Sequence, residues 1–154
     1  MKLAEALLER ADLQKRIEAL QSRVVANASH QEGEEPAENA AELLEACLTA
    51  LSALEKLVTA INVTNTVTVT PEGRSLTAAL AAREVLRQRH GILVRAADAA
   101  SGSWGQRQMR SELRQLSALP VRIVRAQADA VAQQLREIDV EIQRTNWEAE
   151  LRQS

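Results

Sequence analysis

An apolar repeat at alternating spacings of three and four residues runs through four segments of the chain and restricts them to long helices. The most regular repeat comprises Val121, Val124, Ala128, Val131, Leu135, Ile138 and Ile142. A mean spacing of about 3.5 residues is that of helices packed as a coiled coil. The sequence therefore predicts helices over residues 3–29, from residue 40 onward, over 76–100 and from Pro120 to Trp147. The expected fold is all-α, an antiparallel bundle of four long helices.

The composition agrees with helix packing as the source of the core. The chain has no Phe and no Tyr, and its two aromatic residues are Trp104 and Trp147, so the core has to be built from Leu, Ile, Val and Ala. These side chains interdigitate well between helices. The 154 residues, 45% hydrophobic and 26% charged, are expected to form a single soluble domain over 1–154.

Residues 30–39 separate the first two helices. Gly33, Pro36 and four glutamates disfavour a helix there, and Asn39 followed by Glu42 is typical of the start of the next helix. A link this short favours antiparallel neighbours. The core stripe expected for the second helix is Leu44, Cys47, Leu51, Leu54, Val58, Ile61 and Asn65.

One run differs from the rest, because Val and Thr alternate from Val63 to Thr70 with the period of a half-buried strand. We therefore expect a small β-like connector over 64–70, a turn at Pro71-Glu72-Gly73, and Ser75 as the cap of the next helix. A strand needs a partner. We expect residues 114–120 to be extended and to supply one, and the return after Gly73 is the other candidate.

Six polar residues occupy apolar positions of the repeats, and we call them the polar seam. They are Arg10, Asn27, Asn65, Arg83, His90 and Thr145. In one interpretation they fix helix register and oligomeric state, as a polar residue in a coiled-coil seam does. In the other they line a pocket or an ion-pair layer, with Arg83 and His90 facing Asp139 or Glu141.

The sequence gives little support to catalysis. Four glutamates between Glu32 and Glu38 lack the spacing of a calcium loop, and Cys47, His30 and His90 form no zinc pattern. We therefore predict no metal site, no cofactor and no catalytic residues. An enzyme or metal protein that uses the polar seam is kept as a second alternative.

A phosphate-binding role is the first alternative. Arg87, Arg95 and Arg110 are the candidate contacts for nucleic acid or phosphorylated ligands. Glu84 and Asp98 interleave with them, and the net charge of −2 gives no general attraction to nucleic acid.

The main prediction is a non-enzymatic structural or interaction protein that associates with itself. Leu7, Leu8, Leu48, Leu57, Ile123 and Val140 lie outside the main apolar stripes. Stripes this wide predict a homo-oligomer built through helix faces, with closed symmetry. No run approaches 18 apolar residues and the N-terminal segment carries Glu5 and Glu9, so we expect no membrane span and a cytoplasmic location.

Several segments recur in one order in an uncharacterised bacterial family. They are MKLAEALLERADLQKRI, QEGEEPAE, INVTNT, GRSLTAALAAREVLRQRHGIL, ADAASG, RSEL and LREIDVEIQRTNW. The chain thus resembles the small proteins labelled septicolysin, and it departs from them between Gly105 and Pro120. The resemblance implies a small, soluble, all-helical protein that self-associates and has no established activity. Pore formation is not expected, since no Trp-rich membrane loop is present.

Overall fold

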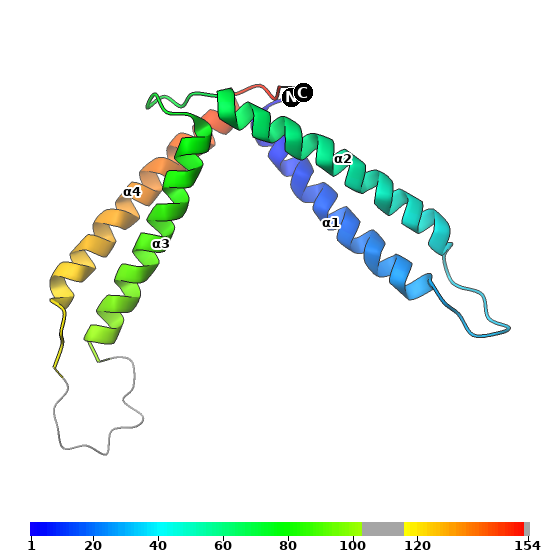
Figure 1. The fold of residues 1–154 in the computed structure, drawn as a ribbon, viewed down its shortest axis with the longest axis horizontal. Coiled ribbons are helices and arrows are strands. Elements are labelled where there is room, and N and C mark those ends of the chain that lie inside the picture. Colours follow the sequence, from blue (N-terminus) through cyan, green and yellow to red (C-terminus); the bar gives the residue numbers. More distant parts are fainter. Residues whose placement is uncertain (103–115, 153–154) are drawn as a thin grey trace, which may run out of the picture. The chain divides into compact units, whose positions relative to one another are not determined.

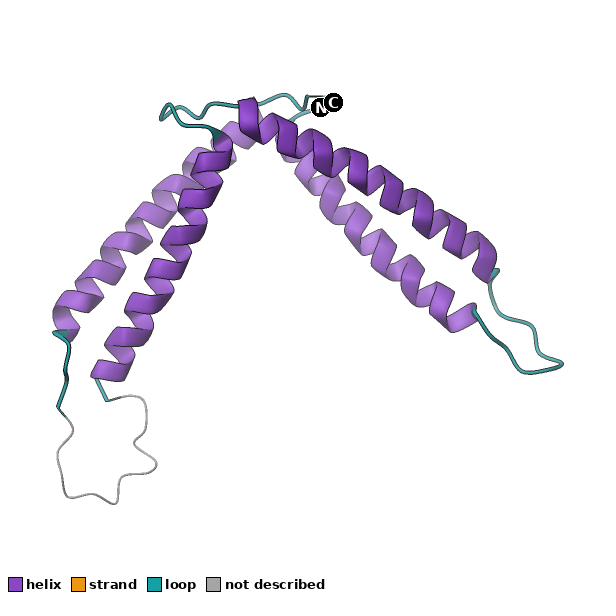
Figure 2. Ribbon diagram, viewed as in Figure 1, coloured by secondary structure: helices purple, strands orange, loops and turns teal. Residues whose placement is uncertain are grey.

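The computed structural model describes residues 1–102 and 116–152, which form four α-helices (Figures 1 and 2). The helices are α1 (Leu3–Asn27), α2 (Ala40–Val67), α3 (Leu76–Ala100) and α4 (Val121–Glu148). The all-α prediction is confirmed, and the helix bounds fall within a few residues of those expected from the apolar repeats.

The chain divides into two compact units. The first comprises Met1–Thr68 with Thr145–Ser154, and the second comprises Val69–Arg144. The first contains α1 and α2 with the end of α4, whereas the second contains α3 and most of α4. That the whole chain makes a single domain stays a prediction.

In the first unit α1 and α2 form the antiparallel pair that the short link predicts. Leu20, Leu43 and Cys47 are buried together, with Ile17, Val24 and Ala46 packed around them. At the open end of the pair, Arg23 on α1 binds Glu38, and the backbone N–H of Glu38 donates to Asn27 Oδ1 at 3.0 Å. The start of α2 is capped as expected, because Asn39 Oδ1 accepts from the backbone N–H of Ala41 at 3.0 Å.

The expected β-like connector over 64–70 is wrong in most of its length, since α2 continues through it to Val67. Ile61 and Thr64 lie three residues apart and are both buried, as expected for two residues on the same face of a helix. The threonine hydroxyls bond back into the helix, from Thr64 Oγ1 to the carbonyl of Ala60 at 2.7 Å and from Thr66 Oγ1 to that of Val63 at 2.7 Å. Burial and these bonds override the weak strand preference of isolated β-branched residues.

The predicted turn and cap are present after α2. The N–H of Gly73 donates to the carbonyl of Thr70 at 2.9 Å, and Gly73 has φ 81°, a conformation that favours glycine. Ser75 Oγ accepts from the N–H of Ala78 at 3.2 Å and caps α3. Val69 forms an isolated bridge with Ser75, so the return after Gly73 is its partner. Residues 116–120 are neither helix nor strand, and 114–115 lie outside the described residues.

In the second unit α3 and α4 are antiparallel. Arg83 lies 3.6 Å from Asp139, and Arg125 lies 3.2 Å from Asp98. The residue nearer the start of α3 thus pairs with the residue nearer the end of α4, as antiparallel helices require. The apolar repeats face inward, with Leu76, Ala79 and Ala97 of α3 buried, and also Val124, Val131, Ile138 and Ile142 of α4.

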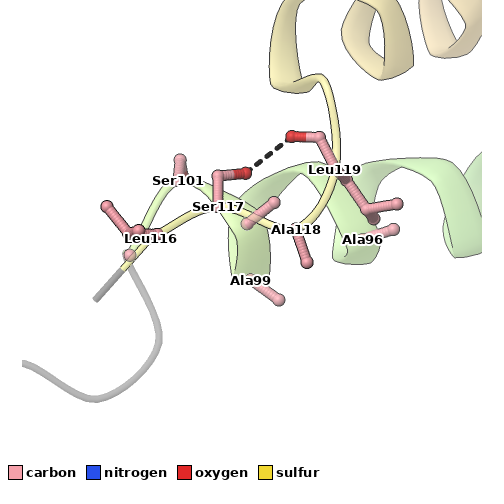
Figure 3. Close-up of a pocket in the computed structure, with 9 residues that line it drawn as sticks. Ala96, Ala99, Ser101, Leu116, Ser117, Ala118 and Leu119 are labelled. Atoms are coloured by element: carbon pink, nitrogen blue, oxygen red, sulfur yellow. Dashed lines mark hydrogen bonds between the residues drawn. The ribbon is translucent and has the colours of Figure 1, made fainter.

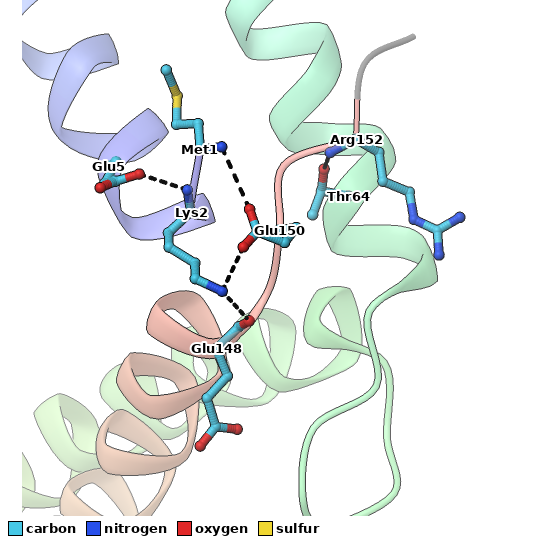
Figure 4. A network of polar contacts seen from close by, with 7 residues as sticks. All are labelled: Met1, Lys2, Glu5, Thr64, Glu148, Glu150 and Arg152. Carbon is cyan, nitrogen blue, oxygen red and sulfur yellow. Dashed lines mark hydrogen bonds and ion pairs between the residues drawn. The ribbon is translucent and has the colours of Figure 1, made fainter.

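The two chain ends meet in the first unit (Figure 4). The N–H of Leu3 donates to the carbonyl of Ala149 at 2.9 Å, and Lys2 Nζ lies 2.6 Å from Glu150 Oε1. The N–H of Arg152 donates to Thr64 Oγ1 at 2.9 Å, so this buried hydroxyl also receives a bond from the C-terminal segment. The C-terminal segment thereby closes one end of the α1–α2 pair.

Candidate functional site

The outward face of α2 is the main feature of the first unit that the fold leaves unexplained. This helix has 28 residues, and its charged side chains are Glu42, Glu45, Glu55 and Lys56. Leu44, Leu48 and Leu51 are 48%, 55% and 44% exposed. Their spacings of four and three residues place them on one face, which we call the leucine face.

Within the first unit α1 is the helix that packs along this part of α2, and the leucine face lies outside that contact. The side toward α1 buries Leu43, Cys47 and Ala50. The sequence prediction had placed Leu44 and Leu51 in the core stripe, and this is wrong, because the cluster buried against α1 contains Leu43 and Cys47. A helix that is apolar all round requires cover on more than one side.

By length and composition, α2 alone among the described helices would be able to cross a membrane. Its most apolar stretch has a mean hydropathy of 1.4 over 18 residues, of which 22% is buried. Thr, Ser and Ala interrupt the leucines of this helix. Glu55 and Lys56 lie near the middle of the helix, where a bilayer tolerates charge least.

Two shallow grooves run along α2 on either side of Glu45 and Thr49. One, of about 390 Å³, is lined by Ala41, Leu44, Glu45, Leu48, Thr49 and Ser52. The other, of about 440 Å³, lies between α1 and α2 and is lined by Leu13, Arg16, Glu42, Glu45, Ala46, Thr49, Ala50 and Ala53. They meet at Glu45 and Thr49, so the surface offers hollows with charged residues at the edge.

Polar side chains on the exposed part of α2 are already hydrogen-bonded within the helix. Ser52 Oγ donates to the carbonyl of Leu48 at 3.2 Å, and Thr59 Oγ1 donates to that of Glu55 at 2.9 Å. A hydroxyl paired in this way loses little when water is removed. The face is therefore chemically suited to a dry contact.

The structure distributes the polar seam between the two units. Arg10, Asn27, Asn65 and Thr145 belong to the first, whereas Arg83 and His90 belong to the second. Asn27 bonds the end of α1 to Glu38, Thr145 is buried, and Arg83 faces Asp139. The Nε atom of Arg10 is buried without a hydrogen-bond partner in the described part of the chain. The six seam residues are thus divided between the two units.

The buried carboxylate of Glu141 in the second unit pairs with an arginine that the sequence prediction did not consider. Glu141 on α4, with a side chain 7% exposed, binds Arg74 in the turn before α3. Arg74 Nε donates to Glu141 Oε1 at 3.0 Å, and Nη2 donates to Oε2. The hydrogen bonds from Arg74 hold the pKa of Glu141 below its usual range, against the opposing effect of burial. Sixty-seven residues separate the partners, so no local pattern signals the pair.

The candidate phosphate-binding arginines do not form a built site. Arg87 and Arg95 are both exposed on α3, and Arg95 Nε donates to the carbonyl of Gly91 at 3.2 Å. Eight residues separate the two, about 12 Å along the helix. Arg110 lies outside the described residues.

A further pocket, of about 440 Å³, lies beside the end of α3 (Figure 3). Ala96, Ala99 and Ser101 line one side, and residues 116–119 line the other. Ser117 Oγ donates to the carbonyl of Leu119 at 2.6 Å. No acid or base lines this pocket within the described residues, and in the same part of the chain no three His, Cys, Asp or Glu side chains come together as metal ligands.

The comparisons with other proteins agree with an all-helical chain of undefined activity. A family described as a family of unknown function, DUF6847, matches residues 10–151. The chain belongs to this family. It is also similar to a solved structure described as a functionally unknown conserved protein from Corynebacterium diphtheriae, with 38% identity, a TM-score of 0.93 and 99% of each chain covered. No protein with a curated description matches at a significant level. The family match establishes the family and the solved structure shares the fold, and neither description names a function.

Proposed function

We propose that this DUF6847 protein is a non-enzymatic, self-associating helical protein, and that α2 supplies its association surface. The observation that carries the proposal is the exposed leucine face on a helix with four charged residues in 28. Exposed apolar patches of this kind mark protein or membrane contacts. The internally bonded hydroxyls of Ser52 and Thr59 support a contact that excludes water.

The free energy expected from covering the leucine face is large enough to favour association. Full burial of a leucine side chain stabilises by about 1.5–3 kcal/mol. Each of the three leucines is about half exposed, so covering each contributes about 1 kcal/mol. A contact between two copies buries three leucines from each copy and therefore gives about 6 kcal/mol.

Light scattering coupled to size-exclusion chromatography tests the proposal at micromolar concentration. The wild-type protein is expected to be an oligomer, and Leu48→Glu is expected to shift it toward the monomer. Val25→Glu on α1 is the matched control, since Val25 is 73% exposed and lies outside α2. A monomeric wild-type protein would refute self-association.

Three further expectations accompany this proposal. We place the protein in the cytoplasm, in keeping with a helical protein that binds its own copies. The name septicolysin would then denote self-associating helical relatives rather than pore formers. Phosphate binding through Arg87, Arg95 and Arg110 stays a prediction, which a salt titration with a short DNA duplex tests, because phosphate contacts weaken steeply with salt.

A further inference from the structure

The helices of the chain occur as two pairs of equal lengths. α1 and α3 each have 25 residues, and α2 and α4 each have 28. When the first residues of α1 and α3 are aligned, identical residues recur without a gap over about four turns. They are Leu3 and Leu76, Ala6 and Ala79, Leu7 and Leu80, Arg10 and Arg83, Leu13 and Leu86, and Arg16 and Arg89. The shared residues include an arginine at an apolar position, which helix periodicity does not require.

The second helices of the two pairs correspond in the same way. When the first residues of α2 and α4 are aligned, every buried residue of α2 matches a buried residue of α4. The matched residues are Leu43 and Val124, Cys47 and Ala128, Ala50 and Val131, Ala60 and Glu141, Ile61 and Ile142, and Thr64 and Thr145. An asparagine follows the threonine in both helices. Burial therefore falls at the same positions of α2 and α4.

A short extended segment follows α2 and is bonded to the residues just before α3. Val69 forms an antiparallel bridge with Ser75. The N–H of Thr70 donates to the carbonyl of Arg74 at 2.8 Å. All four residues belong to the second unit.

The same arrangement occurs after α4, within the first unit. Glu150 forms an antiparallel bridge with Lys2, just before α1 (Figure 4). The N–H of Leu151 donates to the carbonyl of Met1 at 2.9 Å. These four residues are the ones that the two alignments match to the bridge and the hydrogen bond after α2. The correspondence therefore continues beyond the helix ends.

We propose that the chain is a tandem repeat of one helix-pair structure, with residues 1–70 as the first half and 74–151 as the second. Helix lengths, identical residues, buried positions and the bonds outside the helices all give the same alignment. Two unrelated amphipathic helix pairs would share the apolar spacing, but not the bonds beyond their ends. In this arrangement the two chain ends meet at the position that corresponds to the turn at residues 71–73. The repeat does not depend on the proposed self-association, and a monomeric protein would leave it standing.

The repeat explains why Arg10 differs from its counterpart. Arg83 lies 3.6 Å from Asp139. In the first half Val58 stands at the position of Asp139, and the Nε atom of Arg10 is buried with no hydrogen-bond partner among the described residues. An acid at position 58 is therefore expected to restore the ion pair of the second half.

The two halves differ on the outward side of their second helices. Leu48 corresponds to Asp129, and Leu51 corresponds to Ala132. The helix pair of the second half thus forms without leucine at these positions. The leucine face is therefore not a requirement of the repeated structure.

Transfer of the ion pair from the second half to the first tests the alignment. Val58→Asp is made in the wild type and in Arg10→Met, and urea midpoints are measured by circular dichroism at one protein concentration. Leu57→Asp is the matched control, because Leu57 is also half-buried on α2 and corresponds to the apolar Ile138.

Val58→Asp is expected to lower the midpoint at least about twice as far in Arg10→Met as in the wild type, since Arg10 neutralises the new carboxylate. Leu57→Asp is expected to lower it equally in both. Equal losses from Val58→Asp in the two backgrounds would overturn the alignment of the halves.

Circular permutation tests the position assigned to the chain ends. The permutant runs from Arg74 to residue 154, continues directly into Met1 and ends at Gly73, so that residues 152–154 form a link as long as the turn at 71–73. It carries Ser154→Gly, to match Gly73 with its φ of 81°. The control permutant lacks residues 153–154. Its one-residue link is too short for the bond between Leu151 and Met1.

The full-length permutant is expected to keep the helix content of the wild type and to unfold in one cooperative urea transition. The control is expected to have a lower urea midpoint than the full-length permutant. A full-length permutant that does not fold, or a control with the same midpoint, would overturn the correspondence between the chain ends and the turn.

Discussion

Replacement of Glu141 by Gln is expected to destabilise the second unit by about 2 kcal/mol at pH 7. The carboxylate is 7% exposed and accepts two bonds from Arg74, with Nε at 3.0 Å. Gln keeps the shape and one acceptor but leaves the guanidinium without its counter-charge. Removal of one partner from a fully buried pair costs about 3–5 kcal/mol, and this figure is reduced here because the Arg74 side chain is 38% exposed and can be rehydrated.

The pH dependence gives a second and more specific readout. Since Arg74 holds the folded-state pKa of Glu141 below its unfolded value, the stabilisation is present above about pH 4.3. It is lost as the pH falls through the lowered folded-state pKa. The difference in stability between the wild type and Glu141→Gln is therefore expected to be full at pH 7 and to shrink toward pH 3.

Urea unfolding followed by circular dichroism measures both effects, at one protein concentration because association shifts apparent stability. Glu137→Gln is the matched control. It lies one turn earlier on α4, is exposed, and accepts a bond from Gln133 Nε2 at 3.0 Å. The control is expected to change stability by less than about 0.5 kcal/mol. Equal effects of the two substitutions, or a difference that does not vary with pH, would refute the role assigned to the ion pair.

Three other predictions concern the helix ends and the chain termini. Asn39→Ala removes the cap of α2 and is expected to cost about 1 kcal/mol in urea unfolding; no change would show that the cap contributes nothing. Gly73→Ala, at φ 81°, is expected to lower the thermal midpoint, whereas Gly91→Ala, inside α3 with its nearest contact at 3.9 Å, is expected to raise it; the opposite order would contradict the helix and turn assignments. Deletion of residues 149–154 removes the carbonyl that binds Leu3, so amide exchange is expected to accelerate at the start of α1, and unchanged exchange there would contradict the closure by the C-terminal segment.

Local sequence patterns determined where most helices lie. The 3-4 spacing of apolar residues, Asn39 before α2 and Ser75 before α3 act within a few residues, so they can be read without knowing what packs on them. The same locality explains the error at residues 64–67. Alternating Val and Thr favour a strand in isolation, but burial of Ile61 and Thr64 on one face favours the helix. That burial depends on the rest of the unit.

Only the tertiary structure decided which side of each helix is covered. The apolar repeat of α2 pointed to Leu44 as a core residue, whereas the structure buries its neighbour Leu43 and leaves Leu44 exposed. Nor did the sequence pair Arg74 with Glu141, since the two are 67 positions apart in the chain. Periodicity is a property of one helix, whereas the choice of face and of ion-pair partner depends on the second helix that packs against it.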